Sequence, residues 1–247
     1  MLKFITFLLV FFCPALLADI PLSTLIPKVK PAVVAIAIYN PTAAPRLKLI
    51  GSGFAIAPGN KIVTNYHVIE QVLDETKLES YVVLSGKADN PVIHRINKRK
   101  TAPLHDLAVL EIDQTLPALE LATDETAEGT AIAYTGFPIT GVLGMFPATH
   151  SGIISALTPI AIPVDNAATL NPRMLKQLRQ PFFVYQLDST AYPGNSGSPV
   201  YRLSDGKVVA VINMVLVKSS REAVLSDPSG ISYAIPVHFL QQLIAQP

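Results

Sequence analysis

Cysteine is almost missing from this chain, and its single copy, Cys13, lies in an apolar run near the amino terminus. Without that run the chain has no cysteine and can form no disulfide, so core burial and hydrogen bonding must supply its stability. A lipid-attachment site would need a small residue before the cysteine, whereas Phe12 is bulky. We therefore expect no lipid anchor.

The apolar run is itself too short to span a bilayer. It covers residues 4–17, is broken by Pro14, and falls short of the ~20 residues of a membrane-spanning helix. Lys3 precedes it and Ala18 follows at a suitable cleavage site, which is the pattern of a secretory signal peptide over residues 1–18. We expect cleavage, export to the periplasm or the medium, and no lasting membrane anchor.

An excess of charge of one sign is also lacking. The net charge is +1, and removal of Lys3 leaves 18 basic against 18 acidic residues. A chain without a broad cationic field is not expected to bind nucleic acid. A short basic cluster at 95–100 (Arg95, Lys98, Arg99 and Lys100) is explained by solvated charge on a strand end and loop, and we assign it no role.

Short β-branched runs separated by Gly, Pro, Asn and Asp fill the chain after residue 19, a pattern typical of an all-β sandwich or barrel. Removal of 18 residues from 247 leaves 229, enough for one large all-β domain or two small ones sharing an interface. The candidate strands form two sets of six, with a turn-rich junction near 120–130. They cover residues 32–39, 50–57, 61–65, 80–85, 92–97 and 106–113, then 131–137, 147–156, 182–187, 198–202, 207–217 and 230–235.

Two segments read as helices. Residues 236–245 carry apolar side chains at helical spacing, and Pro236 suits a first-turn position. A shorter helix is predicted over 172–179, with Asn171 as its cap. It lies within a long connection, 157–181, which we interpret as a candidate lid or regulatory loop because long loops in compact domains are often functional.

The segment Gly194–Pro199 (GNSGSP) presents Ser196 on a glycine-flanked turn. A serine hydroxyl is a weak nucleophile that needs a base to take its proton. Gly194 allows a tight turn that aims its own N–H and that of Ser196 at one point, as an oxyanion hole requires. An ordinary turn is the alternative for these residues alone.

A histidine and an aspartate precede this serine in the order of a catalytic triad. His67 lies in TNYHV and Asp106 in HDLAVL. Histidine is a base near neutral pH, and a buried carboxylate on its other ring nitrogen sets the tautomer and stabilises the charge it acquires. We expect Asp106 to begin an alternating strand with its carboxylate directed inward, and His105 to face the other way as a structural residue.

At these residues the chain resembles the trypsin-like serine proteases of the chymotrypsin fold, and more closely the protease domain of the HtrA/Deg group. The resemblance runs from about residue 26 to 244. It includes IPKVKPAVV at 26–34 as the group's first strand and GSGF at 51–54 as its second. It continues with SGIISAL at 151–157 before the nucleophile loop and GISYAIP at 230–236 as the final strand.

The resemblance implies a protease domain over 19–247 with two six-stranded β-barrels of chymotrypsin type. The first barrel covers about 30–125, the second about 126–235, and a closing C-terminal helix covers 236–245. The triad would assemble across the cleft between the barrels. HtrA proteins usually append a PDZ domain, which we do not expect here because the chain ends just past the helix.

The resemblance also implies a substrate pocket. The strand 209–214 should pair with extended substrate, and the pocket should be lined by Thr190, Val211, Ile212, Asn213 and Met214. Because no charge is present among them, we expect small or medium apolar side chains in the substrate. Asn195 replaces the aspartate of trypsin-type zymogens, which excludes activation through an ion pair with a new amino terminus. Glutamyl endopeptidases share the SGSP ending but place a histidine where Asn213 stands, which disfavours glutamate specificity.

Together these observations predict an exported serine endopeptidase that hydrolyses polypeptides through an acyl-enzyme intermediate and uses neither a metal nor a cofactor. The alternative is a catalytically silent peptide-binding or chaperone-like protein on the same fold. The long connection at 157–181 favours it, whereas the intact triad opposes it. An esterase using the same residues is a third possibility. The sequence indicates no particular oligomeric state.

Overall fold

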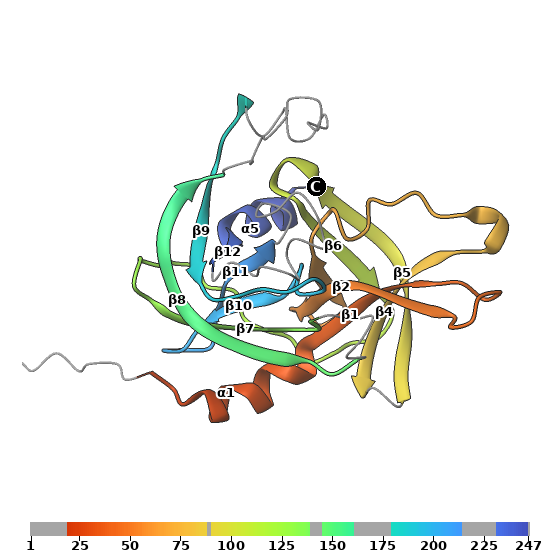
Figure 1. Ribbon diagram of the computed structural model, residues 1–247, viewed down its shortest axis with the longest axis horizontal. Helices are drawn as coiled ribbons and strands as arrows, with labels where there is room; N and C mark the ends of the chain where they lie inside the picture. Colours follow the sequence, from red (N-terminus) through yellow and green to blue (C-terminus); the bar gives the residue numbers. More distant parts are fainter. Residues whose placement is uncertain (1–18, 88–89, 139–144, 161–178, 214–230, 247) are drawn as a thin grey trace, which may run out of the picture.

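The computed structural model describes residues 19–87, 90–138, 145–160, 179–213 and 231–246. They form two closed six-stranded antiparallel barrels and a C-terminal helix (Figure 1), which confirms the predicted fold class. The predicted signal peptide and nearly all of the predicted helix over 172–179 lie outside the described residues. No helix within the described ranges is both long and apolar enough to cross a bilayer.

The first barrel closes in the order β1-β2-β3-β6-β5-β4, and each strand runs antiparallel to both neighbours. All six strands were predicted, although β5 is longer than expected and carries the basic cluster in its middle rather than at its end. The strands are β1 (Val33–Tyr39), β2 (Leu47–Ile56), β3 (Lys61–Thr64), β4 (Ser80–Lys87), β5 (Asn90–Ala102) and β6 (Leu107–Ile112).

The second barrel has the same connectivity as the first. Read from β7, its order is β7-β8-β9-β12-β11-β10, so each strand has the neighbours of the strand six places earlier in the chain. Its strands are β7 (Ala131–Gly136), β8 (Ala148–Pro159), β9 (Phe183–Asp188), β10 (Pro199–Arg202), β11 (Val208–Asn213) and β12 (Ile231–Pro236). The two barrels therefore have the same topology, although the sequence contains no internal repeat of fixed period.

The hydrophobic core explains why β1 is apolar on both faces. Val34 and Ile36 point into the first barrel and join its interior cluster, whereas Val33, Ala35 and Ala37 belong to a larger cluster that continues into the second barrel. Successive strand residues point to opposite faces, so a strand between two cores must be apolar throughout. The β1 strand is thus part of the wall that the two barrels share.

Residues 26–34 are not a single strand, contrary to the resemblance. The chain forms helix α1 (Leu22–Val29) and a 3-10 turn, η1 (Lys30–Ala32), before β1 begins. Leu25 and Val29, four residues apart and therefore on one helix face, are both buried. This segment contacts the second barrel, since the Ile20 N–H donates to the Leu203 carbonyl at 2.8 Å.

The closing helix α5 (Val237–Ala245) confirms the helical spacing read from the sequence, because Val237, Leu240 and Leu243 are its buried residues. Its last turn is contacted from the other barrel. The Lys100 ammonium donates to the carbonyls of Ile244 and Gln246, where a helix leaves carbonyls without partners of their own. One member of the basic cluster thus has a structural role.

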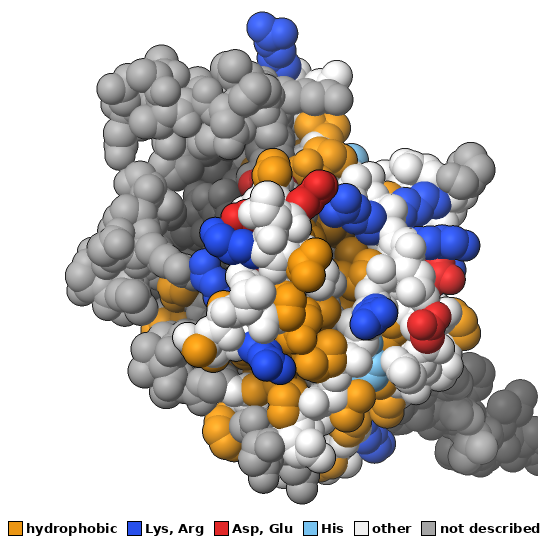
Figure 2. All heavy atoms as spheres, turned by 90° about the vertical axis from the view of Figure 1, so that its right-hand side faces the viewer, with side chains coloured by type: hydrophobic (Ala, Val, Ile, Leu, Met, Phe, Trp, Pro, Cys, Tyr) orange, Lys and Arg blue, Asp and Glu red, His pale blue; other side chains and the backbone are white. Residues whose placement is uncertain are grey.

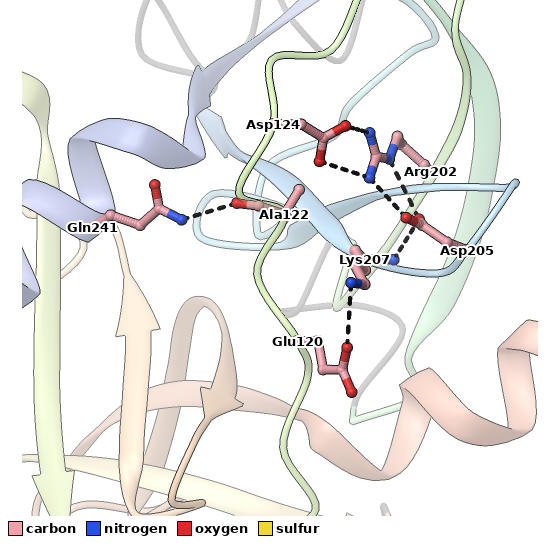
Figure 3. Close-up of polar contacts among 7 residues, drawn as sticks. All are labelled: Glu120, Ala122, Asp124, Arg202, Asp205, Lys207 and Gln241. Atoms are coloured by element: carbon pink, nitrogen blue, oxygen red, sulfur yellow. Dashed lines mark hydrogen bonds and ion pairs between the residues drawn. The ribbon is translucent and has the colours of Figure 1, made fainter.

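The connection between the barrels is attached to the second barrel and to α5 (Figure 3). The Arg202 guanidinium binds Asp124, with nitrogen–oxygen distances of 2.5 and 3.1 Å, and Asp205 at 2.7 Å. These hydrogen bonds lower the pKa of Asp124. The Gln241 side chain donates to the Ala122 carbonyl at 2.9 Å. This part of the connection is therefore fixed against the second barrel and α5.

Candidate active site

His67 and Asp106 meet at one end of the first barrel. His67 lies in the connection between β3 and β4, and Asp106 lies directly before β6. The ring Nδ1 of His67 is 2.6 Å from Asp106 Oδ2, and the backbone N–H of His67 donates to Asp106 Oδ1 at 2.9 Å. One carboxylate therefore holds both the ring and the main chain of the histidine. A proton on Nδ1 leaves Nε2 free to act as the base.

Asp106 was expected to be the first residue of a strand, but its main chain lies before β6 in a more constrained conformation. It ends the 3-10 turn η3 (Pro103–His105) in a left-handed conformation, with φ of 52°, which aspartate tolerates better than most residues. Its carbonyl accepts hydrogen bonds from the Asn65 side chain at 3.0 Å and the Tyr66 N–H at 3.1 Å. The residue is 2% exposed. The segment before His67 thus fixes the main chain of the aspartate whose carboxylate fixes His67.

His105 lies in η3, where its ring stacks on Phe239 of α5 with centroids 4.3 Å apart and meets Phe182 edge-on at 4.9 Å. Burial lowers the pKa of His105, and the nearby His238 lowers it further. Its interactions with these rings agree with the structural role that we predicted.

Ser196 lies in the connection between β9 and β10, and this loop packs against the first barrel. Its carbonyl accepts a hydrogen bond from the Ser52 N–H of β2 at 2.9 Å. A Cβ on Gly51 would stand 3.3 Å from that carbonyl and 2.8 Å from the side chain of Val68, the neighbour of His67. Only a glycine leaves room for the two loops to approach so closely. The nucleophile loop and the histidine loop therefore converge.

Within the described ranges, no hydrogen bond joins the Ser196 hydroxyl to His67, and Ser196 is 7% exposed. Contacts of this kind are often long in unliganded sites and shorten when substrate binds. The arrangement brings the three residues to one region, with the contact between His67 and Asp106 already formed.

The main-chain hydrogen bonds of this loop are consistent with the predicted oxyanion hole. The N–H groups of Asn195, Gly197 and Ser198 all donate to backbone carbonyls. Those of Gly194 and Ser196 have no acceptor in the part of the chain that the structure describes. Gly194 has φ of 100°, a conformation that side chains rarely permit. The two residues predicted to bind the oxyanion are thus the two with unused donors.

Ser52 supports this loop and was missed by the sequence reasoning. Its hydroxyl donates to the Gly194 carbonyl at 2.7 Å and accepts from the Phe137 N–H at 2.9 Å. Ser52 is fully buried. Its only signal in the sequence is a polar residue in the middle of an apolar strand, within the GSGF motif. The first barrel therefore shapes the loop that carries Ser196 in the second barrel.

A model of the trypsin-like peptidase domain matches residues 51–211, a span that includes His67, Asp106 and Ser196. The chain belongs to the trypsin-like peptidase family. Relatives include DegP-like periplasmic serine endoproteases. One from Rickettsia conorii is 33% identical over 205 residues, covering 81% of this chain and 34% of the relative. One from Halomonas elongata is 30% identical over 190 residues, covering 76% and 33%. The chain thus spans about a third of the length of these relatives.

Solved structures share the fold of this trypsin-like peptidase. The serine endoprotease from Yersinia pestis superposes with a TM-score of 0.60 at 24% identity, covering 90% of this chain and 64% of the other. The Rv3671c protease of M. tuberculosis in its active form gives a TM-score of 0.64 at 20% identity, covering 99% and 93%. The similarity to the HtrA/Deg group read from the sequence is consistent with these relatives.

Asn213 has a different position from the one we predicted for this peptidase. We placed it in the substrate pocket, but its side-chain amide donates to Asp106 Oδ2 at 2.9 Å, and the residue is 1% exposed. The same oxygen receives His67 Nδ1. A residue of the second barrel thus binds the carboxylate of the first, and sequence patterns carried no sign of it.

Most of the described strand that carries Asn213 cannot pair with substrate. Val211 pairs with Pro199 of β10 and Ile235 of β12, and the backbone groups of Ile212 are bonded to Gly197 and Ser198. Both Val211 and Ile212 are fully buried. The prediction is therefore wrong for residues 209–212, because neighbouring segments already occupy both edges, whereas Asn213 pairs with Tyr233 of β12 on one edge. Met214 lies outside the described residues.

Hydrogen bonds from side chains of β7 and β12 hold the segment that contains Thr190. Its carbonyl accepts a hydrogen bond from the Tyr134 hydroxyl. The Ser232 hydroxyl donates to the Ser189 carbonyl at 2.6 Å and accepts from the Ala191 N–H at 2.7 Å. Burial raises the pKa of Tyr134, so this phenol stays a donor. Ser232 and Tyr134 were not identified from the sequence, although they position the residue we placed near the pocket base.

Among the described side chains, no group of three or more His, Cys, Asp or Glu residues is arranged to hold a metal ion.

Proposed function

We propose that this chain is a serine endopeptidase that cleaves polypeptides with Ser196 as nucleophile, His67 as base and Asp106 as orienting carboxylate. The observation that carries the proposal is the double contact of Asp106 with the ring and main chain of His67, beside a loop with two unused N–H donors. Membership of the trypsin-like peptidase family supports the same chemistry.

The proposed reaction begins when His67 Nε2 takes the Ser196 proton as Oγ attacks the scissile carbonyl carbon. The carbonyl oxygen becomes negative and accepts hydrogen bonds from the Gly194 and Ser196 N–H groups. Asp106 stabilises the imidazolium, which then protonates the leaving amine as the C–N bond breaks. Water, deprotonated by His67, hydrolyses the acyl-enzyme and restores the serine.

We also propose that the protein acts after export. The predicted signal peptide over 1–18 supports this, as do relatives that are named periplasmic. Mass spectrometry of the protein from the periplasmic fraction should find Asp19 at its amino terminus. An uncleaved protein that stays in the cytoplasm would contradict export without affecting the proposed chemistry.

Active-site labelling tests the nucleophile. A fluorophosphonate probe should label the wild type and not Ser196→Ala. Ser198→Ala is a matched control, because this serine lies in the same buried loop and its hydroxyl has no hydrogen-bond partner among the described residues. Labelling of all three proteins would contradict the assignment of Ser196. Peptide binding without labelling of the wild type would favour the silent binding module.

Digestion of an unstructured protein separates a peptidase from an esterase. The wild type and Ser198→Ala should degrade it, and Ser196→Ala should not. Hydrolysis of small esters by a wild type that leaves polypeptides intact would replace the peptidase by an esterase.

A further inference from the structure

A continuous groove lies on the first barrel, beside the connection that carries His67. Its two lobes, of about 350 and 650 Å³, share Ile69, Leu73, Glu79, Tyr81 and Arg99. Figure 2 faces the end of the molecule formed by this barrel and shows hydrophobic side chains in a band between charged ones. Ile69 is buried and joins the barrel core, so the groove has an apolar floor.

One wall of the groove is a loop held in a single shape. The Tyr81 hydroxyl donates to the Gln71 carbonyl at 2.7 Å. Asp74 caps the following 3-10 turn through the Thr76 N–H at 3.1 Å, and the Glu79 carboxylate accepts the Asp74 N–H at 3.0 Å. Hydrogen bonds from Lys77 and Thr76 lower the pKa of Asp74 to about 2, so this cap is charged at neutral pH.

This wall nevertheless presents an apolar side chain to solvent, since Val72 is 92% exposed and lines the larger lobe. A loop with many internal hydrogen bonds has lost conformational freedom before anything binds. Such preorganisation lowers the entropy cost of binding. An exposed valine on a fixed wall over an apolar floor is suited to receive another apolar side chain.

The opposite wall supplies unpaired positive charge. Lys98 and Arg99 of β5 line the smaller lobe, and both are exposed. Neither side chain forms an ion pair or hydrogen bond with any residue that the structure describes, although the main chain of both residues pairs with β6. Lys100, the next residue, instead donates to the end of α5. Glu70 and Glu75 line only the larger lobe and Lys98 lines only the smaller one, so a carboxylate is favoured at the end of the groove that Lys98 and Arg99 form.

We propose that this groove is an exosite for an extended polypeptide segment that places an apolar side chain against Val72 and a carboxylate on Lys98 and Arg99. The inference rests on the proposed function for its purpose, which is to hold part of the substrate outside the catalytic cleft. The larger lobe reaches the catalytic region at Tyr66, which precedes His67 and donates its N–H to the Asp106 carbonyl at 3.1 Å.

Binding is measured without turnover, in the full chain carrying Ser196→Ala. The probes are a fluorescent peptide with leucines followed by aspartates and a second peptide with lysines in place of the aspartates, followed by fluorescence anisotropy. Arg99→Glu should weaken binding of the acidic peptide about tenfold and favour the basic one, with the difference shrinking at high salt. Arg95→Glu is the matched control, because Arg95 is exposed on the same strand but does not line the groove.

A second variant tests the apolar contact. Val72→Asp changes a side chain that supports no core, so it should fold normally and weaken the acidic peptide several-fold. Equal losses in Arg99→Glu and Arg95→Glu, or no loss in either groove variant, would overturn the exosite. So would complete competition by a peptide that fills only the catalytic cleft.

Failure of the proposed function gives a different result. A wild type that neither reacts with the fluorophosphonate nor degrades protein, yet binds the acidic peptide in an Arg99-dependent way, would leave the groove as a peptide site and remove its role in catalysis. An active protease without Arg99-dependent binding would support the proposed function and overturn the exosite.

Discussion

The two barrels have the same strand connectivity but contribute different parts of the candidate site. His67 follows β3, and Ser196 follows β9, which is the equivalent strand of the second barrel. Asp106 precedes β6, and the equivalent connection of the second barrel begins after Asn213, whose side chain reaches back to Asp106. Equivalent loops thus carry His67 in one barrel and Ser196 in the other, so the shared topology determines where these side chains lie and not which residue types they are.

The loops also differ in how they are held. The histidine loop is positioned by Asp106 of its own barrel, through a ring contact and a backbone contact. The serine loop is positioned by Ser52 of the other barrel, which binds the main chain of Gly194 and Ser196. A change at the barrel interface should therefore affect the nucleophile more than the base, and the following variants test this difference.

The largest effect on kcat is expected from a change to Asp106, which positions His67 of its own barrel. Asp106→Asn keeps the side-chain shape but reverses the preferred tautomer of His67, so kcat should fall by about 10⁴. Peptide hydrolysis under saturating substrate measures it. Asp113→Asn, at the other end of β6, is the control and should keep full activity. A loss below about tenfold would show that Asp106 does not orient the base.

A smaller effect on kcat is expected from a change to Ser52, the residue of the first barrel that binds the serine loop of the second. Ser52→Ala leaves the buried Gly194 carbonyl and Phe137 N–H without their partner, which should reduce the free energy of unfolding by about 1–3 kcal/mol. Displacement of the oxyanion donors should lower kcat by about 10². Denaturant unfolding and peptide hydrolysis measure the two effects.

Ser155→Ala is the control for this variant, since Ser155 is an exposed serine on β8 with a hydrogen bond to the Gln186 carbonyl. Unchanged activity and stability in Ser52→Ala would mean that the serine loop keeps its shape without the first barrel.

The reverse contact, from the second barrel to Asp106, should matter less. Asn213→Leu removes one of the three groups that we describe around the carboxylate and should lower kcat about tenfold with little change in KM. An unchanged kcat with reduced stability would assign Asn213 a merely structural role.

The smallest effect concerns the aromatic contact between η3 and α5. Because burial, and then His238, lower the pKa of His105, the folded protein binds this proton less readily than the unfolded chain. Stability from this group is complete above the ordinary value of 6.5 and falls as pH drops below it. Thermal unfolding across this range should show a shallower loss in His105→Phe than in the wild type.

Part of the slope should remain in that variant, since burial also lowers the pKa of His150 and His238. Equal slopes in the two proteins would show that His105 does not contribute to the acid sensitivity.

Local sequence patterns were sufficient to predict much of the fold of this protein. All twelve strands were predicted from short β-branched runs bounded by turn residues, and the closing helix from the helical spacing of its apolar residues. The GNSGSP turn and the order of His67, Asp106 and Ser196 predicted the reacting groups, since this chemistry needs those residue types. Helix α1 was missed because two prolines and a β-branched run resemble the start of a strand.

Sequence alone determined the building units of this protein and the residues able to react, because both depend on neighbours along the chain. Only the tertiary structure decided that Ser52 supports the oxyanion loop and that Asn213 binds Asp106, since these partners are 142 and 107 residues apart. A single buried serine or asparagine carries no period, and even the GSGF motif around Ser52 does not indicate its partner, because that partner is chosen by the way the two barrels pack. The same packing places Lys98 and Arg99 across the groove from Val72, a juxtaposition that no local pattern encodes.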